Sequence, residues 1–553
     1  MNSFSHFRQC AVGVVSLAAI GFAAAAMAQD TRAVGEPKIP RSCIVLSAQL
    51  TAVRNKIEEP DESKADTDRI QNALNNCKQG MAVELRPTPQ RFAFLARVGL
   101  RPVPERNAFL SAPLQLREGV TLLIDQGATL YASRNPKDYE TTPGLCGIIT
   151  HEAGGGCRAL ISATNVKNAA IMGDGVIDGR GDEELYGYDY TWWQMAREAA
   201  PGNQHYNSAR LITANHADGL VLYRITLHNS PNFHVGVMNT NGFTAWGVHI
   251  LTPTTRGVDA RNTDGIDPGS STNITVARSW IESGDDNIAV KTGVTHMSVL
   301  DNHFYNGHGM SIGSDTSTGV SDLLVDGLTL DHTTSGIRIK SNNSRGGLVR
   351  NLLYQNICMR DVRVPIAISP FYNNGTTDAF VDPNIPGDRV PDFKHIILRN
   401  ITDLTPGDVL IAGKDAAHIA EVTLDNVNIL GIKPEQVHTQ FAKIALGPGG
   451  ANFPAAGSVI VATNPGATGS PARAASKPAP AVRTSGATNG AATQSASPPS
   501  AAIAAASPPS PSSAPAQSST PISTFPATTA PAPAAKTKAA APFPCEGKFV
   551  PMQ

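Results

Sequence analysis

The runs NTDG (262–265), SGDDN (283–287) and NGHGM (306–310) follow one another at a constant spacing. Asp264, Asp286 and His308 are separated by steps of 22 residues. Each run leads into a short alternating apolar segment, and later segments read GIRI (336–339) and PIAI (365–368). The apolar residues at equivalent places are Ile266, Ile288, Met310, Ile337 and Ile366. Repeats of 22 to 29 residues, each with a strand too short to bury its apolar side alone, predict a solenoid.

The expected fold class is all-β, a parallel β-helix in which each repeat forms one coil. Equivalent residues then stack at about 4.8 Å, so Asp264, Asp286 and His308 become neighbours on successive rungs. Asp285 lies one residue aside, and its backbone is expected roughly 6 Å from that of Asp264. This spacing is nearer to the separation of about 6.5–9.5 Å between the carboxyl groups of inverting glycosidases than to the roughly 5 Å of retaining ones.

Paired carboxylates at strand ends can also be solvated corner residues, or calcium ligands like those of β-helical pectate lyases. Convergence of Asp264, Asp285 and Asp286 on one pair of rungs, with His308 stacked next, favours a catalytic site. Like charges held this close raise the pKa of one carboxyl group, which supplies a protonated acid. Arg338 and Lys340 share one face of their strand because side chains alternate, so both are expected to point towards the carboxylates.

The runs NTD (262–264), GDD (284–286), GHG (307–309) and RIK (338–340) together resemble the signature of polygalacturonases, the pectin-cleaving glycoside hydrolases of family 28. The resemblance extends from about Asp66 to about Asn428. The segments GHGMSIGSDTSTGV (307–320) and GIRIKSNNSRGG (336–347) are most similar to bacterial endo-acting members. It implies a right-handed parallel β-helix and single-displacement, inverting hydrolysis of α-1,4 bonds in demethylated pectin, with no metal or other cofactor.

The resemblance also implies roles for individual residues. Asp285 is the general acid, Asp264 and Asp286 hold and activate the water, and His308 supports the acid. The substrate-binding residues are Arg338, Lys340, Asn262 and Tyr372, of which Tyr372 is the position that contacts substrate in the family. Asp267 falls in the same column as Arg338 and is expected to pair with it.

The two ends of the chain have their own patterns. An apolar run (11–25) after Arg8, followed by Ala-Met-Ala (26–28), predicts a signal peptide over residues 1–28 that is cleaved after Ala28, and hence a secreted, extracellular protein. The catalytic domain is expected over 29–461. Residues 462–541 are rich in Ala, Pro, Ser and Thr, and 463–544 contain no Asp or Glu, so this segment is expected to be disordered. Residues 542–553 resemble the Cys-bearing closing segment of these enzymes.

Six cysteines remain after the signal peptide, and an even number in an exported chain favours disulfides, although the sequence does not determine the pairing. The working hypothesis pairs Cys43 with Cys77, Cys146 with Cys157 and Cys358 with Cys545. A metal site is the alternative, but no Cys-x-x-Cys or Cys/His cluster supports it.

The segment DTDRIQNALNNC (66–77) has apolar residues at helical spacing and predicts an N-terminal capping helix with Asp66 as its N-cap. Strands are expected at 120–124, 128–131, 170–171 and 176–177, with coils continuing through Leu424. The aromatic insertion at 186–193 either stacks on sugars or, more commonly, packs on its own scaffold.

The formal net charge of −1 argues against partners such as nucleic acid or a membrane surface. The resemblance implies polygalacturonate as the partner, and a monomer is expected. Other functions stay open. They are an exo-polygalacturonase, a rhamnogalacturonan hydrolase, a lyase that needs calcium and a base, and a non-catalytic β-helical adhesin.

Overall fold

A computed structural model describes residues 29–89, 105–151, 155–200, 204–252, 260–373, 382–454, 459–462 and 541–552. The chain divides into two units, residues 1–463 with 538–553 and residues 464–537, and every described residue belongs to the first. The predicted signal peptide and almost all of the Ala/Pro/Ser-rich segment lie outside the described residues. Among the helices that are described, none is both long and apolar enough to cross a bilayer.

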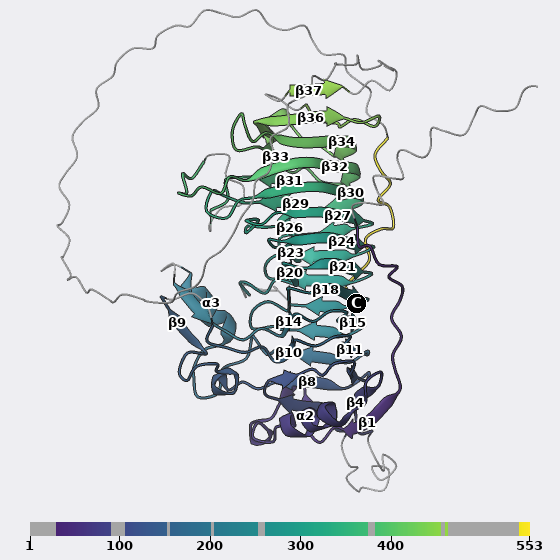
Figure 1. Ribbon diagram of the computed structural model, residues 1–553, viewed down its shortest axis with the longest axis vertical. Coiled ribbons are helices and arrows are strands. Elements are labelled where there is room, and N and C mark those ends of the chain that lie inside the picture. The colour runs from purple at the N-terminus through teal and green to yellow at the C-terminus, as the bar shows by residue number, and fades with distance from the viewer. Residues whose placement is uncertain are drawn as a thin grey trace, which may run out of the picture. The chain divides into compact units, whose positions relative to one another are not determined.

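Three ladders of parallel strands stack coil upon coil, which confirms the parallel β-helix (Figure 1). The ladder that carries the polar motifs consists of β6 (Leu114–Gln115), β10 (Ile161–Thr164), β14 (Ile212–Asn215), β17 (Val235–Met238), β20 (Ile266–Gly269), β23 (Ile288–Val290), β26 (Met310–Ile312), β29 (Ser335–Lys340), β31 (Val364–Ser369), β33 (Val409–Ala412) and β35 (Val437–Gln440). We call it the motif ladder.

The other two ladders complete each coil. The longer one runs through β1 (Ser42–Ser47), β4 (Ala82–Arg86), β7 (Thr121–Ile124), β11 (Ala170–Met172), β15 (Val221–Tyr223), β18 (Asn241–Trp246), β21 (Thr272–Ala277), β24 (Val294–Leu300), β27 (Val320–Asp326), β30 (Leu348–Arg360), β32 (Asp392–Asp403), β34 (Ala420–Ile429), β36 (Ala442–Leu446) and β37 (Val459–Ala462). The shorter one runs through β5 (Ala108–Ser111), β8 (Thr129–Ala132), β12 (Val176–Asp178), β16 (Thr226–His228), β19 (His249–Leu251), β22 (Trp280–Ser283), β25 (His303–Asn306) and β28 (Thr329–Asp331), which pairs with the end of β30.

The register of the motif ladder is the one that the repeat predicts. Ile266 pairs with Ile288, Ile288 with Met310, Met310 with Ile337, and Ile337 with Ile366. All five side chains are fully buried in one continuous core. Burial of such a side chain is worth about 1.5–3 kcal/mol, so a slip of one residue would turn the whole column outwards at large cost.

The capping helix is α2 (Thr67–Asn76), which buries Ile70, Ala73 and Leu74. It covers the first strand of the motif ladder, because Gln71 accepts a hydrogen bond from the Gln115 N–H and donates one to the Gln115 carbonyl. Asp66 occupies the predicted N-cap position, but its side chain makes no cap hydrogen bond. The carboxylate instead accepts from the backbone N–H of Leu110 and from Arg69.

The solenoid extends beyond the predicted strands at both ends. Strands β1, β4 and β5 precede the first predicted one, and β36 and β37 follow Leu424. Smaller elements are the antiparallel pair β2 (Ala52–Val53) and β3 (Lys56–Ile57), and the 3-10 turns η1 (Glu59–Asp61), η3 (Pro136–Tyr139) and η4 (Pro434–Gln436).

An insertion beside the motif ladder contains α3 (Trp192–Ala199) and β13 (His205–Asn207), which pairs antiparallel with β9 (Ile148–Thr150) from the connection before β10. A capping box between Thr191 and Gln194 begins α3. Trp192 and Trp193 are both buried, so the two tryptophans pack on the scaffold and are not available to sugars. The insertion projects from the side of the coils on which β14 and β10 lie (Figure 1).

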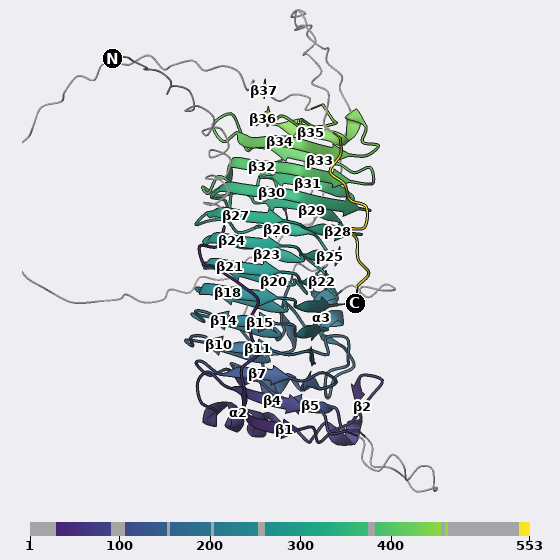
Figure 2. The same ribbon diagram turned by 90° about the vertical axis from the view of Figure 1, so that its right-hand side faces the viewer.

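All three predicted disulfides are present, Cys43–Cys77, Cys146–Cys157 and Cys358–Cys545. The last one ties the C-terminal segment to β30. This segment crosses the rungs beside β28 and β25 (Figure 2), where the Tyr305 hydroxyl donates to the carbonyl of Val550 and Arg360 stacks on Phe549.

Candidate active site

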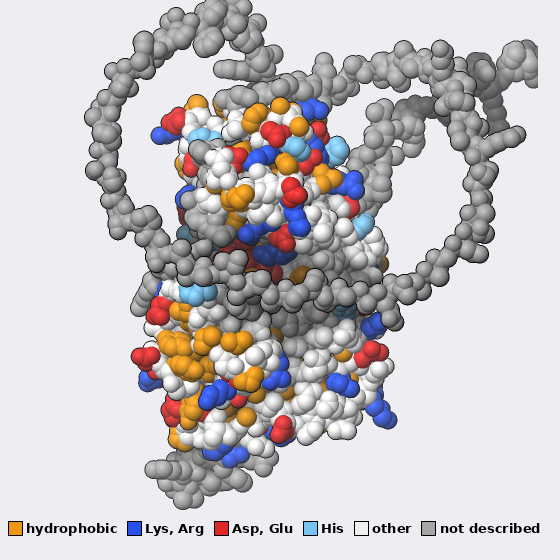
Figure 3. Space-filling model, turned by 60° about the vertical axis from the view of Figure 1, so that its left-hand side comes forward, with side chains coloured by type: hydrophobic (Ala, Val, Ile, Leu, Met, Phe, Trp, Pro, Cys, Tyr) orange, Lys and Arg blue, Asp and Glu red, His pale blue; other side chains and the backbone are white. Residues whose placement is uncertain are grey.

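The predicted site residues lie together at the start of successive strands of the motif ladder. Asp264 precedes β20, Asp285 and Asp286 precede β23, and His308 precedes β26. Carboxylate oxygens of the three aspartates lie within 4.8 Å of one another. Figure 3 shows acidic and basic side chains gathered near the middle of the face that is turned forward there.

Glycine in these motifs lets neighbouring rungs approach. A Cβ atom on Gly265 would lie 2.3 Å from the carbonyl oxygen of Asn287 on the next rung, which no real contact allows. Gly309 has a φ of +79°, and a Cβ there would lie 2.1 Å from the carbonyl oxygen of Ser335. The glycines therefore set the close spacing that brings the carboxylates together.

Asp286 is clamped by two cations from β29. Arg338 Nη1 lies 2.6 Å from Oδ1, and Lys340 Nζ lies 2.8 Å from Oδ2. The Ser311 hydroxyl also donates to Oδ1, at 2.7 Å. Burial alone would raise the pKa of Asp286, but the charges of Lys340 and Arg338 outweigh it and hold the pKa well below its usual range. Asp286 is therefore ionised, and the cations predicted to bind substrate also hold this carboxylate.

Asp264 has the opposite environment. It is buried, and burial together with the charges of Asp267 and Asp285 raises its pKa well above the ordinary value. Lys291 moderates this effect, since its Nζ lies 3.7 Å from Asp264 Oδ2. Burial is the largest cause and the neighbouring carboxylates add to it, so the pKa is raised on Asp264, which was expected to hold the water and not to be the acid.

The predicted pairing of Asp267 with Arg338 was wrong. Asp267 Oδ2 lies 3.2 Å from Lys291 Nζ, whereas Arg338 turns to Asp286. Burial raises the pKa of Asp267 to about 6, although Lys291 lowers it. The stacking column placed Asp267 and Arg338 on one face correctly, but a cation on an intervening strand reaches Asp267 first.

Lys291 was missed as a site residue, although the repeat contains the signal for it. It follows Ile288 by three residues as Lys340 follows Ile337, so both lysines take the same place in their coils. Burial lowers the pKa of Lys291, but Asp267 and Asp264 more than reverse this and raise it, so the lysine stays charged. Lys291 is therefore the cation beside Asp264, just as Lys340 is a cation beside Asp286.

The backbone of Asp264 is fixed by His234, a second residue that the sequence did not reveal. The N–H of His234 donates to the carbonyl oxygen of Asp264 at 2.9 Å, and its Nδ1 lies 3.1 Å from the same oxygen. Its Nε2 lies 2.9 Å from the hydroxyl of Thr252. Burial lowers the pKa of His234 to about 4, so it is neutral at ordinary pH and acts as a positioning residue.

Asp285 is the accessible carboxylate of the three. Its side chain is 24% exposed, compared with 4% for Asp264 and 1% for Asp286. His308 Nε2 lies 4.0 Å from Asp285 Oδ1, and His308 Nδ1 is held by the Thr334 hydroxyl at 2.7 Å. Asp285 is therefore the carboxyl group best placed to meet a bound chain, with His308 beside it.

Asn262 and Tyr372 border the carboxylates on two sides. Asn262 Nδ2 lies 3.5 Å from Asp285 Oδ2, and its Oδ1 accepts a 2.9 Å hydrogen bond from the Tyr206 hydroxyl. The ring of Tyr372 lies 5.3 Å from Lys340 Nζ. The structure thus brings all eight predicted site residues into one cluster. Tyr206 was missed because it comes from β13, 56 residues before Asn262 and outside the repeat.

Asp264, Asp285 and Asp286 have the donor chemistry for a hard cation, because a carboxylate oxygen from each lies within 4.8 Å of the others. Three side-chain cations already neutralise this cluster, namely Lys291, Arg338 and Lys340. Their charge opposes the entry of a divalent metal. The residues present therefore fit acid and base chemistry by the carboxylates better than metal binding.

Comparison with known proteins agrees with this geometry. Residues 109–445 match the family described as glycosyl hydrolases family 28. The chain is 42% identical over 421 residues to an endo-polygalacturonase of Pectobacterium carotovorum subsp. carotovorum, covering 75% of this chain and 94% of that protein. It is 37% identical to a polygalacturonase of Ralstonia solanacearum, covering 71% and 78%. The solved polygalacturonase from Erwinia carotovora ssp. carotovora has a TM-score of 0.63 at 39% identity, covering 74% of this chain and 100% of that one. The chain belongs to glycosyl hydrolases family 28.

Proposed function

We propose that this chain hydrolyses α-1,4-galacturonosidic bonds inside polygalacturonate, as an endo-polygalacturonase with an inverting mechanism. The observation that carries the proposal is that the three carboxyl groups have different environments. An accessible Asp285 stands beside a buried Asp286 that two cations keep ionised and a buried Asp264 whose pKa is raised. Similarity to polygalacturonases over most of the chain supports the choice of substrate.

In this mechanism Asp285 donates its proton to the glycosidic oxygen as the bond from the anomeric carbon breaks. A water on the opposite face of the sugar forms the new bond to that carbon. Asp286 takes the proton that the water releases, and Asp264 holds the water in place. Asp286 then loses that proton to solvent and the accessible Asp285 takes one up, which resets the site.

The carboxylate oxygens lie within 4.8 Å of one another, which is closer than the spacing of about 6.5–9.5 Å typical of inverting enzymes. Two hydrogen bonds of about 2.8 Å that meet at one water span up to roughly 5.6 Å, so Asp264 and Asp286 can share a water. Both oxygens of Asp286 already accept hydrogen bonds, from Arg338, Ser311 and Lys340. Oδ2 accepts the bond from Lys340 and has a second lone pair for a proton of the shared water, so Asp286 can act as the base at this short spacing.

The cations of β29 suit an acidic polysaccharide. Arg338 and Lys340 bring two positive charges against the single carboxylate of Asp286, so a galacturonate carboxylate can bind beside it, by a paired contact to Arg338 and a point contact to Lys340. The proposal includes secretion as a monomer, which the predicted signal peptide over residues 1–28 and three disulfides support.

Digestion of polygalacturonate by the purified protein tests this function. Early products are expected to be mixed oligomers without the absorbance of unsaturated uronides, and NMR of the first product is expected to show the inverted anomer. Monomer or dimer alone would indicate exo action. An unsaturated product would mean a lyase, and a retained anomer would reject the water-based step.

A further inference from the structure

We propose that Arg158 and Arg210 form a second binding subsite for a galacturonate carboxylate, on the opposite side of the catalytic aspartates from Arg338 and Lys340. This inference deepens the proposed function and rests on it, because the ligand is another residue of the same polymer. It assigns a specificity role to a pocket that the catalytic steps do not use.

The pocket has a volume of about 370 Å³ and lies beside β10 and β14. The guanidinium groups come from two different elements. Arg158 follows the disulfide-bonded Cys157, and Arg210 precedes β14. Between them Ser162 and Thr213 line the pocket from the strands below. These two residues pair in register and belong to the column of the motif ladder that runs from Gln115 towards Asp267.

Neither arginine forms an ion pair within the described part of the chain, although Arg210 lies near enough for its charge to act on the buried Asp267. No carboxylate described there lies within ion-pair distance of either guanidinium. Arg158 Nη2 donates to the backbone carbonyl of Asp138, and Arg210 lies 4.7 Å over the ring of Phe233. Both side chains are exposed. Two such arginines in one polar pocket form a site for an anion of carboxylate geometry, which a guanidinium binds with paired hydrogen bonds.

The pocket is connected to the reacting groups by hydrogen bonds. Asn232, which lines it, donates to the Tyr206 hydroxyl at 3.1 Å, and that hydroxyl donates to Asn262 at 2.9 Å. Asn262 in turn lies 3.5 Å from Asp285. The ring of Phe233 also links the two areas, because Lys291 Nζ lies 5.6 Å from its centroid on the catalytic side. A sugar in the pocket is therefore held by the same network that orients Asp285.

The positions along the solenoid allow one polysaccharide chain to reach both this pocket and the catalytic aspartates. Strand β14 lies two rungs before β20, which Asp264 precedes, and β29 lies two rungs after β23, which Asp285 and Asp286 precede. Each interval corresponds to about 10 Å. Positive side chains therefore come from rungs on both sides of the aspartates, and those of β29 reach back to contact Asp286. A polymer with a carboxylate on every sugar that runs along the ladder meets a positive group before and after the scissile bond, which favours cleavage of internal bonds.

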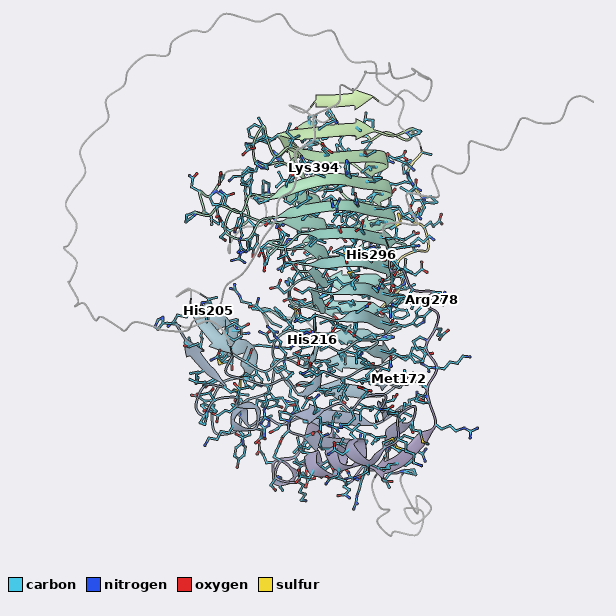
Figure 4. The ribbon with its side chains drawn as sticks, in the orientation of Figure 1. Met172, His205, His216, Arg278, His296 and Lys394 are labelled. Atoms are coloured by element: carbon cyan, nitrogen blue, oxygen red, sulfur yellow. A yellow bond between two sulfur atoms is a disulfide. The ribbon has the colours of Figure 1, made fainter. Side chains whose placement is uncertain are left out.

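The test compares Arg210→Ala and Arg158→Ala with Arg278→Ala. Arg278 is a matched control, since it is also exposed and lies 5.2 Å over an aromatic ring, that of Trp246. It lies on the side of the coils away from His205 and the insertion (Figure 4). We measure kcat and KM on polygalacturonate and on galacturonate oligomers of increasing length, and melting temperatures show whether each variant is folded.

We expect KM for polygalacturonate to rise about 5-fold in each pocket variant, the size of an exposed ion pair, with kcat little changed. The gain in kcat/KM that wild type shows when an added sugar reaches the pocket is expected to disappear, and shorter oligomers are expected to react normally. The preference for polygalacturonate over methyl-esterified pectin should also narrow, because an ester carries no charge. Arg210→Lys is expected to restore part of each effect.

Two results would overturn the subsite. One is unchanged KM and chain-length dependence in both pocket variants, and the other is an equal effect in Arg278→Ala. Failure of the proposed function is distinguishable, because the wild-type protein would then not cleave polygalacturonate at all. A variant that melts early is replaced by Arg210→Gln, which keeps the bulk of the side chain and removes its charge.

Discussion

Arg338 and Asp286 form a buried ion pair, in which Nη1 of the arginine lies 2.6 Å from Oδ1 of the carboxylate. The repeat places the two residues two coils apart, and the sequence indicates a substrate-binding role for the cation. The contact adds a second role, because Arg338 and Lys340 set the ionisation of Asp286 before any substrate binds. Removal of one partner of a buried pair leaves the other charge uncompensated, which costs about 3–5 kcal/mol.

Lys340→Ala is therefore expected to change both kinetic constants. KM for polygalacturonate rises because a uronate contact is lost, and kcat falls at least about 10-fold because Asp286 is no longer held ionised. Since the cation lowers the pKa of Asp286, its removal raises that pKa, and the acid limb of the pH profile moves to higher pH. Lys394→Ala, on β32 of the longer ladder and not on the motif ladder (Figure 4), is the control. A rise in KM with an unmoved pH profile would limit Lys340 to substrate binding.

Asp285→Asn is expected to remove most turnover, by about 10²-fold or more, and to leave KM nearly unchanged. The amide keeps the shape of the side chain but cannot give a proton to the leaving oxygen. Asp174→Asn, at an exposed surface ion pair with Arg224, is the matched change outside the site and is expected to have no effect. Steady-state rates on polygalacturonate decide the point, and near-normal turnover would reject Asp285 as the acid.

Chelation is expected to leave activity unchanged. Lys291, Arg338 and Lys340 already place positive charge around the three aspartates, so the reaction as proposed needs no metal. Rates in excess EDTA, compared with rates after added calcium, provide the measurement. Loss of activity on chelation with recovery in calcium would instead favour the chemistry of a calcium-dependent lyase.

The fold and most of the site could be predicted because a parallel solenoid converts sequence period into position. A single spacing determined that Ile266, Ile288 and Met310 stack, and the polar residues beside them then had to converge. Period does not determine which charges pair within a column, so Asp267 was assigned to Arg338 when Lys291 lay closer. Tyr206 could not be predicted for another reason, because it belongs to an insertion that does not follow the sequence repeat.

Asp264→Asn is expected to stabilise the protein in a pH-dependent way. The folded-state pKa of Asp264 is raised, so between its unfolded value of about 3.9 and the folded value the native state binds more protons and stability falls as pH rises. The asparagine variant does not lose this stability. Its melting temperature should match wild type near pH 4 and exceed it at pH 7, while its activity is low.

The same melts on Asp174→Asn provide the control, because that carboxylate is exposed. A difference between Asp264→Asn and wild type that does not change with pH would mean that ionisation of Asp264 costs the folded protein nothing. If Asp264→Asn is more stable than wild type but inactive, the carboxyl group of Asp264 is needed for function and lowers the stability of the folded protein.

The C-terminal segment is expected to stabilise the solenoid independently of the Ala/Pro/Ser-rich segment before it. Cys545 bridges to Cys358, Val550 accepts from Tyr305, and Phe549 lies against Arg360. We compare a protein truncated after Val461 with one in which residues 463–541 are replaced by a Gly/Ser linker. Cys545 lies against the carbonyl of Thr402 on β32, three rungs or about 14 Å from β37, so about 15 residues suffice to span the gap.

The linker form is expected to keep the wild-type rate on soluble polygalacturonate, since lengthening a flexible loop costs only about 0.6 kcal/mol per doubling and shortening it costs nothing in packed surface. The truncated form loses the disulfide and its neighbouring contacts, and a disulfide in a secreted domain is worth about 2–5 kcal/mol. It should therefore melt at a clearly lower temperature. Cys545→Ser in the linker form separates the bridge from the other contacts, and its melting temperature is expected to lie between those of the two forms. Equal melting temperatures for the truncated and linker forms would mean that the segment only rests on the coils.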